Sequence, residues 1–340
     1  MANRLTQLHR FLPYIVLVGT LSLTSLSAYY AETTARSKDQ LRFENEVQRT
    51  ETEIQQRLST YTTLLRSGAG LFAGSETVTR QDFQNFVAQL KLREQYPGIQ
   101  GFGYTIRLRP EQVTGLMAEM RRQGLSTFNI RPPTPRPEYH AIIYLEPMDR
   151  RNQAAIGYDM FTEATRRVAM ERARDTGQPA ASGRVTLVQE IDPQKQAGFL
   201  LYLPIYRSKT VPATLAERQS QLQGFIYSPF RADDLFEGIF RQQRRRTVNV
   251  WVYDGTELRS ENLLRYPHPS LAAHPSQFRT VRQIRVAGRI WSLVIASRPS
   301  LEQVSESRYA RYILLTGVFG GLVLAGLTWA QVRARQTIER

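Results

Sequence analysis

Two apolar runs without a charged residue stand near the two ends of this sequence, and they limit what the chain can fold into. They cover residues 11–30 and 312–332. Each has about 20 residues, the length at which an α-helix crosses a hydrocarbon core of about 30 Å. The ends of the second run carry aromatic residues, as membrane helices do at the lipid–water interface: Tyr309, Tyr312 and Trp329. Its small residues permit close helix packing: Gly317, Gly320, Gly321 and Gly326. The sequence therefore predicts two membrane-spanning helices.

Basic residues outside the two runs predict how the chain crosses the membrane. Arg4 and Arg10 precede the first run, and Arg333 and Arg335 follow the second. By the positive-inside rule, both termini then lie in the cytoplasm and the segment from about residue 31 to residue 311 lies outside. We expect a two-pass protein of the inner (plasma) membrane with a periplasmic or extracellular domain.

The first run also has features of a cleaved signal peptide. Its basic flank and the small residues at 25–28 (SLSA) match the usual pattern of such peptides. Cleaved and uncleaved forms both stay open. We favour an uncleaved anchor because the run is long and leads directly into a helical pattern.

Composition excludes several classes of site and partner. The 340 residues include no cysteine, which rules out disulfides, thiolate metal sites and a cysteine nucleophile. A net charge of +15 often indicates nucleic-acid binding. Here the basic residues are spread through a segment that the predicted topology places outside, and no nucleic-acid motif accompanies them. We expect no nucleic-acid partner, and interpret the densest basic cluster, residues 241–246, as a solvated face near anionic lipid headgroups.

Residues 31–69 predict a stalk helix that continues from the first membrane span. Apolar residues recur there at steps of three, four and seven: Val47, Ile54, Leu58, Tyr61 and Leu65. The stripe fits packing on the chain's own domain or pairing with a second copy as a coiled coil, which would make a homodimer. We expect the helix to end near residues 67–70, where two glycines favour a C-cap.

The remaining pattern predicts an α+β fold. Helices are expected after residues 77–80 and over 110–123, 162–174 and 232–241. Strands are expected over 99–108, 141–146, 185–189, 198–206, 222–228, 248–254, 280–286 and 289–297. We group them into two tandem PAS-like α/β domains, a membrane-distal one over 70–206 and a membrane-proximal one over 207–300. Residues 1–10 are then a cytoplasmic N-terminus, and residues 333–340 begin a cytoplasmic signalling helix.

Several short motifs appear in an order that resembles the CHASE family. They are residues 96–103 (YPGIQGFG), 157–159 (GYD), 166–167 (RR), 173–177 (ARDTG), 187–188 (LV) and 198–206. CHASE domains are the extracytoplasmic ligand-sensing modules of cytokinin receptors and many bacterial sensor kinases. The resemblance implies a stalk helix followed by two PAS-like domains, with the ligand in the membrane-distal one. Such proteins usually continue into a kinase, cyclase or phosphodiesterase.

The resemblance also implies candidate ligand-binding residues. In cytokinin-binding members, a threonine after the helix-ending Thr-Gly pair helps to frame the pocket, and the matching position here is Ser182. Those members also use an aspartate to bind the adenine ring. The matching position holds Arg150, with Asp149 beside it, in a loop that differs from theirs. The identity of the ligand therefore does not transfer.

Residue chemistry adds further candidates, each with a structural alternative. Asp159 fits a polar group at the edge of a pocket, and equally a helix N-cap, which we favour. Ser182 and Thr186 fit hydrogen bonds to a ligand or ordinary strand positions. The aromatic residues of the predicted strands fit the lining of a cavity or the core: Tyr144, Phe199 and Tyr202.

The sequence contains no pattern that predicts a reaction or a cofactor. His140, His268 and His274 lack the spacing of metal ligands, and no HExxH pattern is present. Nucleophile-elbow, Walker and dinucleotide-binding motifs are likewise missing from strand–turn–helix settings. We therefore expect no catalytic residue, no metal site and no cofactor.

These features together predict a transmembrane sensory receptor module that binds a small extracytoplasmic ligand. The alternative is a two-span envelope adaptor whose outer domain binds another protein. Only eight residues follow the second apolar run. We expect the chain either to be the input half of a longer receptor or to signal through a separate partner such as a histidine kinase.

Overall fold

The computed structural model describes residues 2–241, 246–267, 275–303 and 305–338, and the side chains of residues 11–334 within those ranges. It divides into two compact units. The first unit joins residues up to 46 with 276–278 and 297–340, and the second joins 47–275 with 279–296. Helices and antiparallel strand pairs together give a mixed helix-and-sheet fold, as the α+β pattern predicts.

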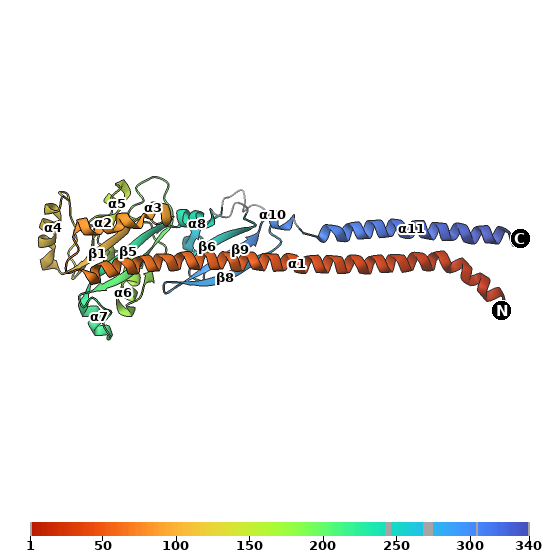
Figure 1. Ribbon diagram of the computed structural model, residues 1–340, viewed down its shortest axis with the longest axis horizontal. Helices are drawn as coiled ribbons and strands as arrows, with labels where there is room; N and C mark the ends of the chain where they lie inside the picture. The colour runs from red at the N-terminus through yellow and green to blue at the C-terminus, as the bar shows by residue number, and fades with distance from the viewer. Residues whose placement is uncertain (1, 242–245, 268–274, 304, 339–340) are drawn as a thin grey trace. The chain divides into compact units, whose positions relative to one another are not determined.

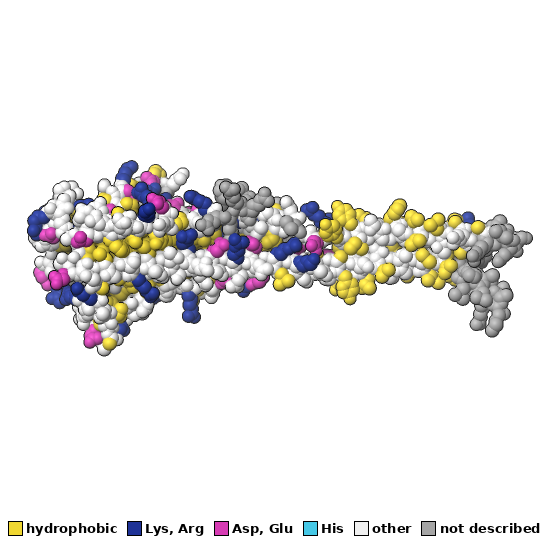
Figure 2. All heavy atoms as spheres, in the orientation of Figure 1, with side chains coloured by type: hydrophobic (Ala, Val, Ile, Leu, Met, Phe, Trp, Pro, Cys, Tyr) yellow, Lys and Arg dark blue, Asp and Glu magenta, His cyan; other side chains and the backbone are white. Residues whose placement is uncertain are grey.

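The first unit contains two helices that are long and apolar enough to cross a membrane. They belong to α1 (Ala2–Gly74) and α11 (Ser307–Ile338). Only 11% and 6% of their most apolar windows are buried, so neither is the core helix of a globular domain. Large apolar side chains lie exposed along both helices (Figure 2). Burying such surface in lipid is favourable, which supports the two predicted spans.

Small residues bring α11 close to α1 within this unit. A side chain added at Gly317 would lie 2.3 Å from the Thr24 hydroxyl oxygen, and one added at Gly321 would lie 2.7 Å from that of Thr20. Only hydrogen fits at these two positions, as expected where helices pack closely in a membrane. Gly320 and Gly326 have nothing within 4 Å and take no part in this contact.

In the second unit, the remainder of α1 packs on the domain through the predicted apolar stripe. All five stripe residues are buried: Val47, Ile54, Leu58, Tyr61 and Leu65. The ring of Tyr61 lies 4.8 Å from that of Phe230, and its hydroxyl donates a hydrogen bond of 2.6 Å to the Pro97 carbonyl oxygen. The prediction of an unbroken amphipathic helix is confirmed (Figure 1).

The predicted end of this helix was wrong. The helix continues through Gly68 and Gly70 to Gly74, and neither of the first two glycines has a positive φ. Gly68 serves packing instead, because a Cβ there would lie 2.5 Å from the Phe102 ring. A glycine required for close approach has the same sequence signature as a glycine that ends a helix.

The larger sheet has five antiparallel strands in the order β2-β1-β5-β4-β3. Its strands are β1 (Phe102–Leu108), β2 (Tyr139–Glu146), β3 (Ala180–Ala181), β4 (Gly198–Tyr206) and β5 (Leu222–Arg231). Every residue of β2 and β4 is buried, so both faces of the sheet are covered. α1 and α2 (Arg80–Leu90) cover one face, and α6 (Ala164–Thr176) covers the other.

Two strand assignments differ from prediction. Residues 185–189 are not a strand: Val185 alone pairs with Gly198, through two hydrogen bonds of 2.8 Å. The chain turns directly afterwards, so the apolar residues Leu187 and Val188 pack on the core without joining the ladder. The strand expected over 222–228 lies in the centre of the five-stranded sheet rather than in a following one.

The smaller sheet has four strands in the order β7-β6-β9-β8. They are β6 (Val248–Asp254), β7 (Leu263–Arg265), β8 (Arg279–Val286) and β9 (Arg289–Ser297). α8 (Ala232–Phe240) leads into this sheet, and Phe236 lies 6.2 Å from the Trp291 ring of β9. The remaining short elements are α3 (Leu92–Gln95), η1 (Pro110–Gln112), α4 (Val113–Arg122), α5 (Arg150–Gln153), η2 (Met160–Thr162), α7 (Leu215–Gln221), η3 (Ser260–Asn262) and α10 (Pro299–Glu302).

The contact between Gly68 and Phe102 leads to a prediction with a matched control in the same helix. Gly68→Ala would force the Phe102 ring away, and we expect it to lower the free energy of unfolding by about 2 kcal/mol. Gly70→Ala meets open space and should raise it by about 0.5–1 kcal/mol, because alanine favours helix. Chemical unfolding of the full chain in detergent measures both. Equal effects of the two substitutions would contradict the packing role of Gly68.

Candidate ligand-binding site

Two buried tyrosines face α6 from the centre of the five-stranded sheet. Tyr202 on β4 pairs directly with Tyr227 on β5, and their ring centroids lie 6.2 Å apart. Neither side chain has measurable exposure. Both belong to a core cluster that includes Ala169 and Met170 of α6. Tyr227 also covers Gly103 of β1, where an added Cβ would lie 2.5 Å from the tyrosine ring.

A buried arginine enters the same cluster from α6. Arg166 is 3% exposed, and its Nη2 donates a hydrogen bond of 3.0 Å to the Thr186 carbonyl oxygen. Its guanidinium carbon lies 5.1 Å from the Tyr158 ring centroid. Arg166 lies on the same buried face of α6 as Ala169 and Met170, which pack in one core cluster with Tyr202 and Tyr227.

Several buried polar atoms near this face have no hydrogen-bond partner within the described part of the chain. They include the Tyr227 hydroxyl oxygen, Arg166 Nε, Thr105 Oγ1 and Asn152 Oδ1. The Tyr202 hydroxyl has only the Met160 sulfur, at 3.4 Å, which is a weak acceptor. Burial raises the pKa of both tyrosine hydroxyls, so both remain protonated donors. Buried polar groups are normally paired, so these atoms make the α6 face a candidate ligand site.

The predicted Ser182 and Thr186 lie beside this cluster, where they are hydrogen-bonded to Leu200 and Arg166. Ser182 is buried after β3, where its Oγ donates to the Gly183 carbonyl oxygen and accepts from the Leu200 amide. Thr186 is exposed, and its carbonyl rather than its hydroxyl contacts Arg166. A role in ligand binding remains a prediction for both.

Asp159 is fully buried and organises the turn before α6. Its carboxylate accepts hydrogen bonds from the Phe161 amide at 3.1 Å and the His140 amide at 2.8 Å, and it pairs with Arg136 at 2.5 Å. The N-cap alternative therefore describes its contacts, because it caps η2. A direct ligand contact by Asp159 stays a prediction.

The two candidates in the preceding loop lie on α5. Asp149 caps this short helix through the Asn152 amide and pairs with Arg93 at 2.8 Å. Arg150 is exposed. Nothing in these contacts joins the two side chains to Tyr202 or Arg166.

Tyr144 and Phe199 lie on the opposite face of the sheet from Tyr202. The register aligns Tyr202 and Tyr227 with Gly103, and the adjacent row aligns Ile226 and Tyr104 with Tyr144. Adjacent rows of a sheet face opposite sides. Tyr144 accordingly packs near Phe83 of α2, and its hydroxyl donates to the Val78 carbonyl oxygen.

Phe199 follows the same alternation along β4. It is three residues from Tyr202, so the two side chains point to opposite faces. Its ring stacks on Phe230 at 5.0 Å and meets the edge of Trp291 at 4.9 Å. The eight candidates therefore do not converge on one pocket, because residue type alone does not say which face a strand residue occupies.

Sequence reasoning missed Arg166, Tyr227 and Asn152 as site residues. The first could have been found, because Arg166 precedes Ala169, Met170 and Ala173 by three, four and seven residues and so lies on the buried face of its helix. Nothing local marks Tyr227 and Asn152, since their surroundings depend on strand pairing and on the loop fold.

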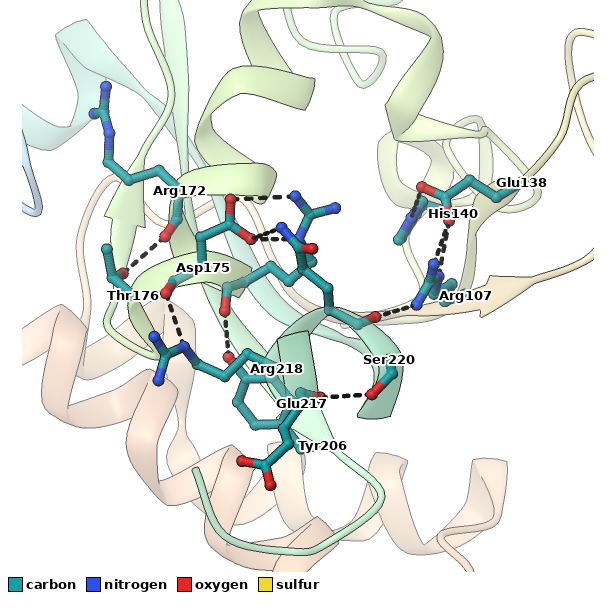
Figure 3. Close-up of polar contacts among 12 residues, drawn as sticks. Arg107, Glu138, His140, Arg172, Asp175, Thr176, Tyr206, Glu217, Arg218 and Ser220 are labelled. Carbon is teal, nitrogen blue, oxygen red and sulfur yellow. Dashed lines mark hydrogen bonds and ion pairs between the residues drawn. The ribbon is translucent and has the colours of Figure 1, made fainter. Parts of the chain in front are cut away.

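A second polar cluster lies at the C-terminal end of α6 (Figure 3). Asp175 accepts from Arg174 at 2.6 Å and from Gln219 of α7 at 3.2 Å. The Tyr206 hydroxyl donates to the Arg174 carbonyl oxygen at 2.6 Å, and burial raises its pKa to about 12. These groups satisfy one another, unlike those around Tyr227, so we interpret this cluster as structural.

An open cleft of about 550 Å³ lies beside the loop that contains α5. Arg80, Arg131 and Gln153 are among its lining residues. Asn152 and Ala155 of the same loop are fully buried. The segment 148–156 therefore separates this cleft from the buried interior.

The described residues contain no group of three or more His, Cys, Asp or Glu side chains that could hold a metal ion. His140 is enclosed between aromatic rings, with Phe161 at 4.1 Å. His268 and His274, and residues 242–245 of the basic cluster, lie outside the described residues.

The pair of His140 and Glu138 predicts two separate pH effects on stability (Figure 3). Burial lowers the pKa of His140 from 6.5, so the unfolded chain takes up a proton first and the free energy of unfolding falls as pH drops through 6.5. Contacts with His140 and Arg107 hold the pKa of Glu138 at about 2, and the stability this gives is lost only below pH 4.5.

We therefore expect His140→Gln to reduce the loss of stability between pH 7.5 and pH 5. Glu138→Gln should lower the free energy of unfolding above pH 4.5 and reduce its further fall below pH 4.5. Urea unfolding of the full chain in detergent from pH 7.5 to about pH 3 is the measurement. Parallel curves for the parent and His140→Gln between pH 7.5 and pH 5 would count against the buried neutral histidine.

Several solved structures are similar to this chain at low identity. An extracellular ligand-binding receptor from Desulfohalobium retbaense is 14% identical, with a TM-score of 0.46 over 75% of this chain and 40% of that one, so the chain spans well under half of that receptor. The periplasmic sensory domain of the Campylobacter jejuni chemoreceptor Tlp1 is 12% identical, with a TM-score of 0.44 over 76% of this chain and 94% of that one. No curated protein matches the chain.

A family model gives the assignment. The CHASE domain model matches residues 76–264, which contain the whole five-stranded sheet, α6 and the cluster around Tyr227. This match covers more than half of the 340 residues. The chain belongs to the CHASE-domain family, whose members are extracytoplasmic sensory input modules.

Proposed function

We propose that this chain binds a small extracytoplasmic ligand in its five-stranded-sheet domain and transmits the event through its second membrane helix. The observation that carries the proposal is the set of unpaired buried polar groups on the α6 face, at Arg166 and Tyr227, inside the region that matches a sensory family. A sensor needs an interior that gains favourable contacts when its ligand enters, and unpaired donors provide such contacts.

The proposed topology places both termini in the cytoplasm. Two apolar helices at the ends of the chain flank the sensor domain, and arginines follow the second span. Basic residues on the cytoplasmic side are the usual determinant of orientation. We also propose a PAS-like architecture for the membrane-distal domain, supported by its antiparallel order β2-β1-β5-β4-β3.

A route for the signal is provided by residues 181–184, which connect the two sheets of the second unit. The Ala181 amide donates to the Ala287 carbonyl oxygen at 2.9 Å, in the turn between β8 and β9. The Arg184 amide donates to Asp254 of β6 at 2.8 Å, and Arg289 of β9 pairs with both oxygens of the same carboxylate at 2.7 and 2.8 Å. Asp254 is 7% exposed, so this pair is held in a poorly solvated environment.

The same segment also touches the ligand side. Ser182 between these contacts is bonded to Leu200 of β4 in both directions, through its amide and its hydroxyl. A shift of α6 or β4 on ligand entry would therefore move residues 181–184 and change the distances within the Asp254–Arg289 pair. β9 ends at Ser297, and the chain continues from there toward the second membrane helix. Signalling requires that the ligand bind one arrangement of this junction better than the other.

The output and the partners remain part of the proposal. The cytoplasmic end of α11 would act on a kinase or cyclase output, within a longer chain or as a separate protein. A homodimer through α1 is compatible with the polar face that α1 leaves exposed opposite its buried stripe.

Ligand binding is tested by thermal unfolding of the full chain in detergent. The panel should contain amino acids, carboxylates, sugars, nucleobases with adenine-type cytokinins, and short peptides. A true ligand at 100 times its dissociation constant stabilises by about 2.7 kcal/mol, so we expect a concentration-dependent rise in Tm of about 5 °C. A well-folded sample that responds to no compound would favour the adaptor that binds another protein.

The junction is tested with the ligand found in that screen. Asp254→Asn keeps the shape of the side chain and removes its charge. We expect this variant to bind the ligand while the ligand-dependent change in hydrogen exchange at β8 and β9 is lost. Glu257→Gln is the matched control. Glu257 lies three residues after Asp254 and forms an exposed pair with Arg259. An unchanged exchange response in Asp254→Asn would rule out this route.

A further inference from the structure

The chemistry around Arg166 and Tyr227 indicates what kind of ligand the site accepts. Three donor groups meet on the α6 face: the Arg166 guanidinium, the Tyr227 hydroxyl and the Tyr202 hydroxyl. Among the described residues, the acceptors near these donors include the Thr186 carbonyl oxygen, the Met160 sulfur and the unpaired Asn152 Oδ1. All three acceptors are uncharged, so a ligand that brings a charged acceptor would bind these donors more strongly.

The charge balance points to an anionic acceptor. Arg166 is 3% exposed, and burying a guanidinium without a counter-charge costs several kcal/mol, so a nearby carboxylate is expected. The carboxylate nearest to it is that of Glu163, 3.7 Å from Arg166 Nε, which is longer than a hydrogen bond.

Glu163 is also hydrogen-bonded to the backbone at the start of α6. Its two oxygens accept hydrogen bonds from the Thr165 amide at 2.9 Å and the Arg166 amide at 3.0 Å, because it caps α6. Its side chain is 36% exposed, so water weakens its effect on Arg166. Because Glu163 caps α6, Arg166 Nε has no carboxylate within hydrogen-bond distance among the described residues.

We infer that the ligand is a small monocarboxylate whose oxygens are received by Arg166 Nε and the Tyr227 hydroxyl. This inference rests on the proposed function and specifies its ligand. A carboxylate supplies two acceptor oxygens and one negative charge, which matches one guanidinium and the adjacent hydroxyls. A phosphate dianion would bring a second charge for which the described residues of this cluster hold no second cation.

The rest of the cluster sets the character of the ligand body. The neighbouring side chains are apolar, and several of those on α6 are small. They include Met160, Ala169, Ala173, Leu200 and Phe225. A ligand body that displaces part of this apolar packing would be a short aliphatic chain or a single aromatic ring. Met160 belongs to the single turn η2, and its sulfur accepts the hydrogen bond of the Tyr202 hydroxyl. A carboxylate oxygen is a stronger acceptor than this sulfur.

Entry is possible beside α5. The segment 148–156 lines the open cleft with Gln153 and Ala154 and contributes the buried Asn152 and Ala155 to the interior. It is a short helix with turns, so its displacement opens the interior without breaking a strand of the sheet.

The test compares acids with their uncharged isosteres on the full chain in detergent. The probes are acetate, butyrate, hexanoate, benzoate and phenylacetate, each with its primary amide. We expect at least one acid to raise Tm with a saturable concentration dependence and its amide to have no effect. Tyr227→Phe should weaken the Kd of that acid about tenfold, since it removes one hydrogen bond to a charged group.

Arg166→Gln should weaken the same Kd about 100-fold. Arg166→Lys is the second variant, which keeps the charge in case the glutamine variant folds poorly, and we expect intermediate affinity. Tyr206→Phe is the matched control for Tyr227→Phe, because it removes a tyrosine hydroxyl on the neighbouring strand β4 that donates to the Arg174 carbonyl oxygen. Its Kd should equal that of the parent.

Three outcomes would overturn the inference. An amide that binds as well as its acid, or an Arg166→Gln or Tyr227→Phe variant with parental affinity, would remove the assigned contacts. Failure of every acid, with a response to another compound of the broad panel, would reject the carboxylate and keep the proposed sensor. Failure of both panels would reject both.

Discussion

Close packing between α1 and one face of the five-stranded sheet is the interaction on which the second unit depends. Five residues of one helix stripe are buried there, and each contributes about 2 kcal/mol by leaving water. Gly68 lets the helix approach the Phe102 ring, and Tyr61 bonds to the Pro97 carbonyl oxygen. Because this face is filled by aromatic and aliphatic groups, it holds the sheet rigid. The opposite face is then available for polar chemistry.

The two faces of the sheet differ in how completely their polar groups are paired. On the α1 face, side chains such as Tyr144 and Phe199 are packed among aromatic rings. On the α6 face, Arg166 and Tyr227 are buried with unused hydrogen-bonding capacity. Leaving such groups unpaired costs stability, and the ligand that we propose for this site would recover it by pairing them.

The junction at residues 181–184 places the responsive face in contact with the smaller sheet. One short segment bonds to β4, to the β8–β9 turn and to Asp254. Gly183 is required there, because a Cβ would lie 2.8 Å from Thr165 and 3.0 Å from Asp254. In the proposed sensor, a closely packed junction of this kind would transmit a displacement from one sheet to the other.

The sequence by itself determined the features that depend on local pattern. The two apolar runs, the stripe from Val47 to Leu65, the limits of β4, β6 and β9 and the family motifs all follow from neighbouring residues, and the structure agrees with them. Only the tertiary structure decided which candidates meet. Tyr202 faces α6 and Tyr144 faces α2 because of the strand register, and Tyr227 joins the site because β5 enters the sheet between β1 and β4. Strand pairing joins residues far apart in the chain, so no local pattern encodes it.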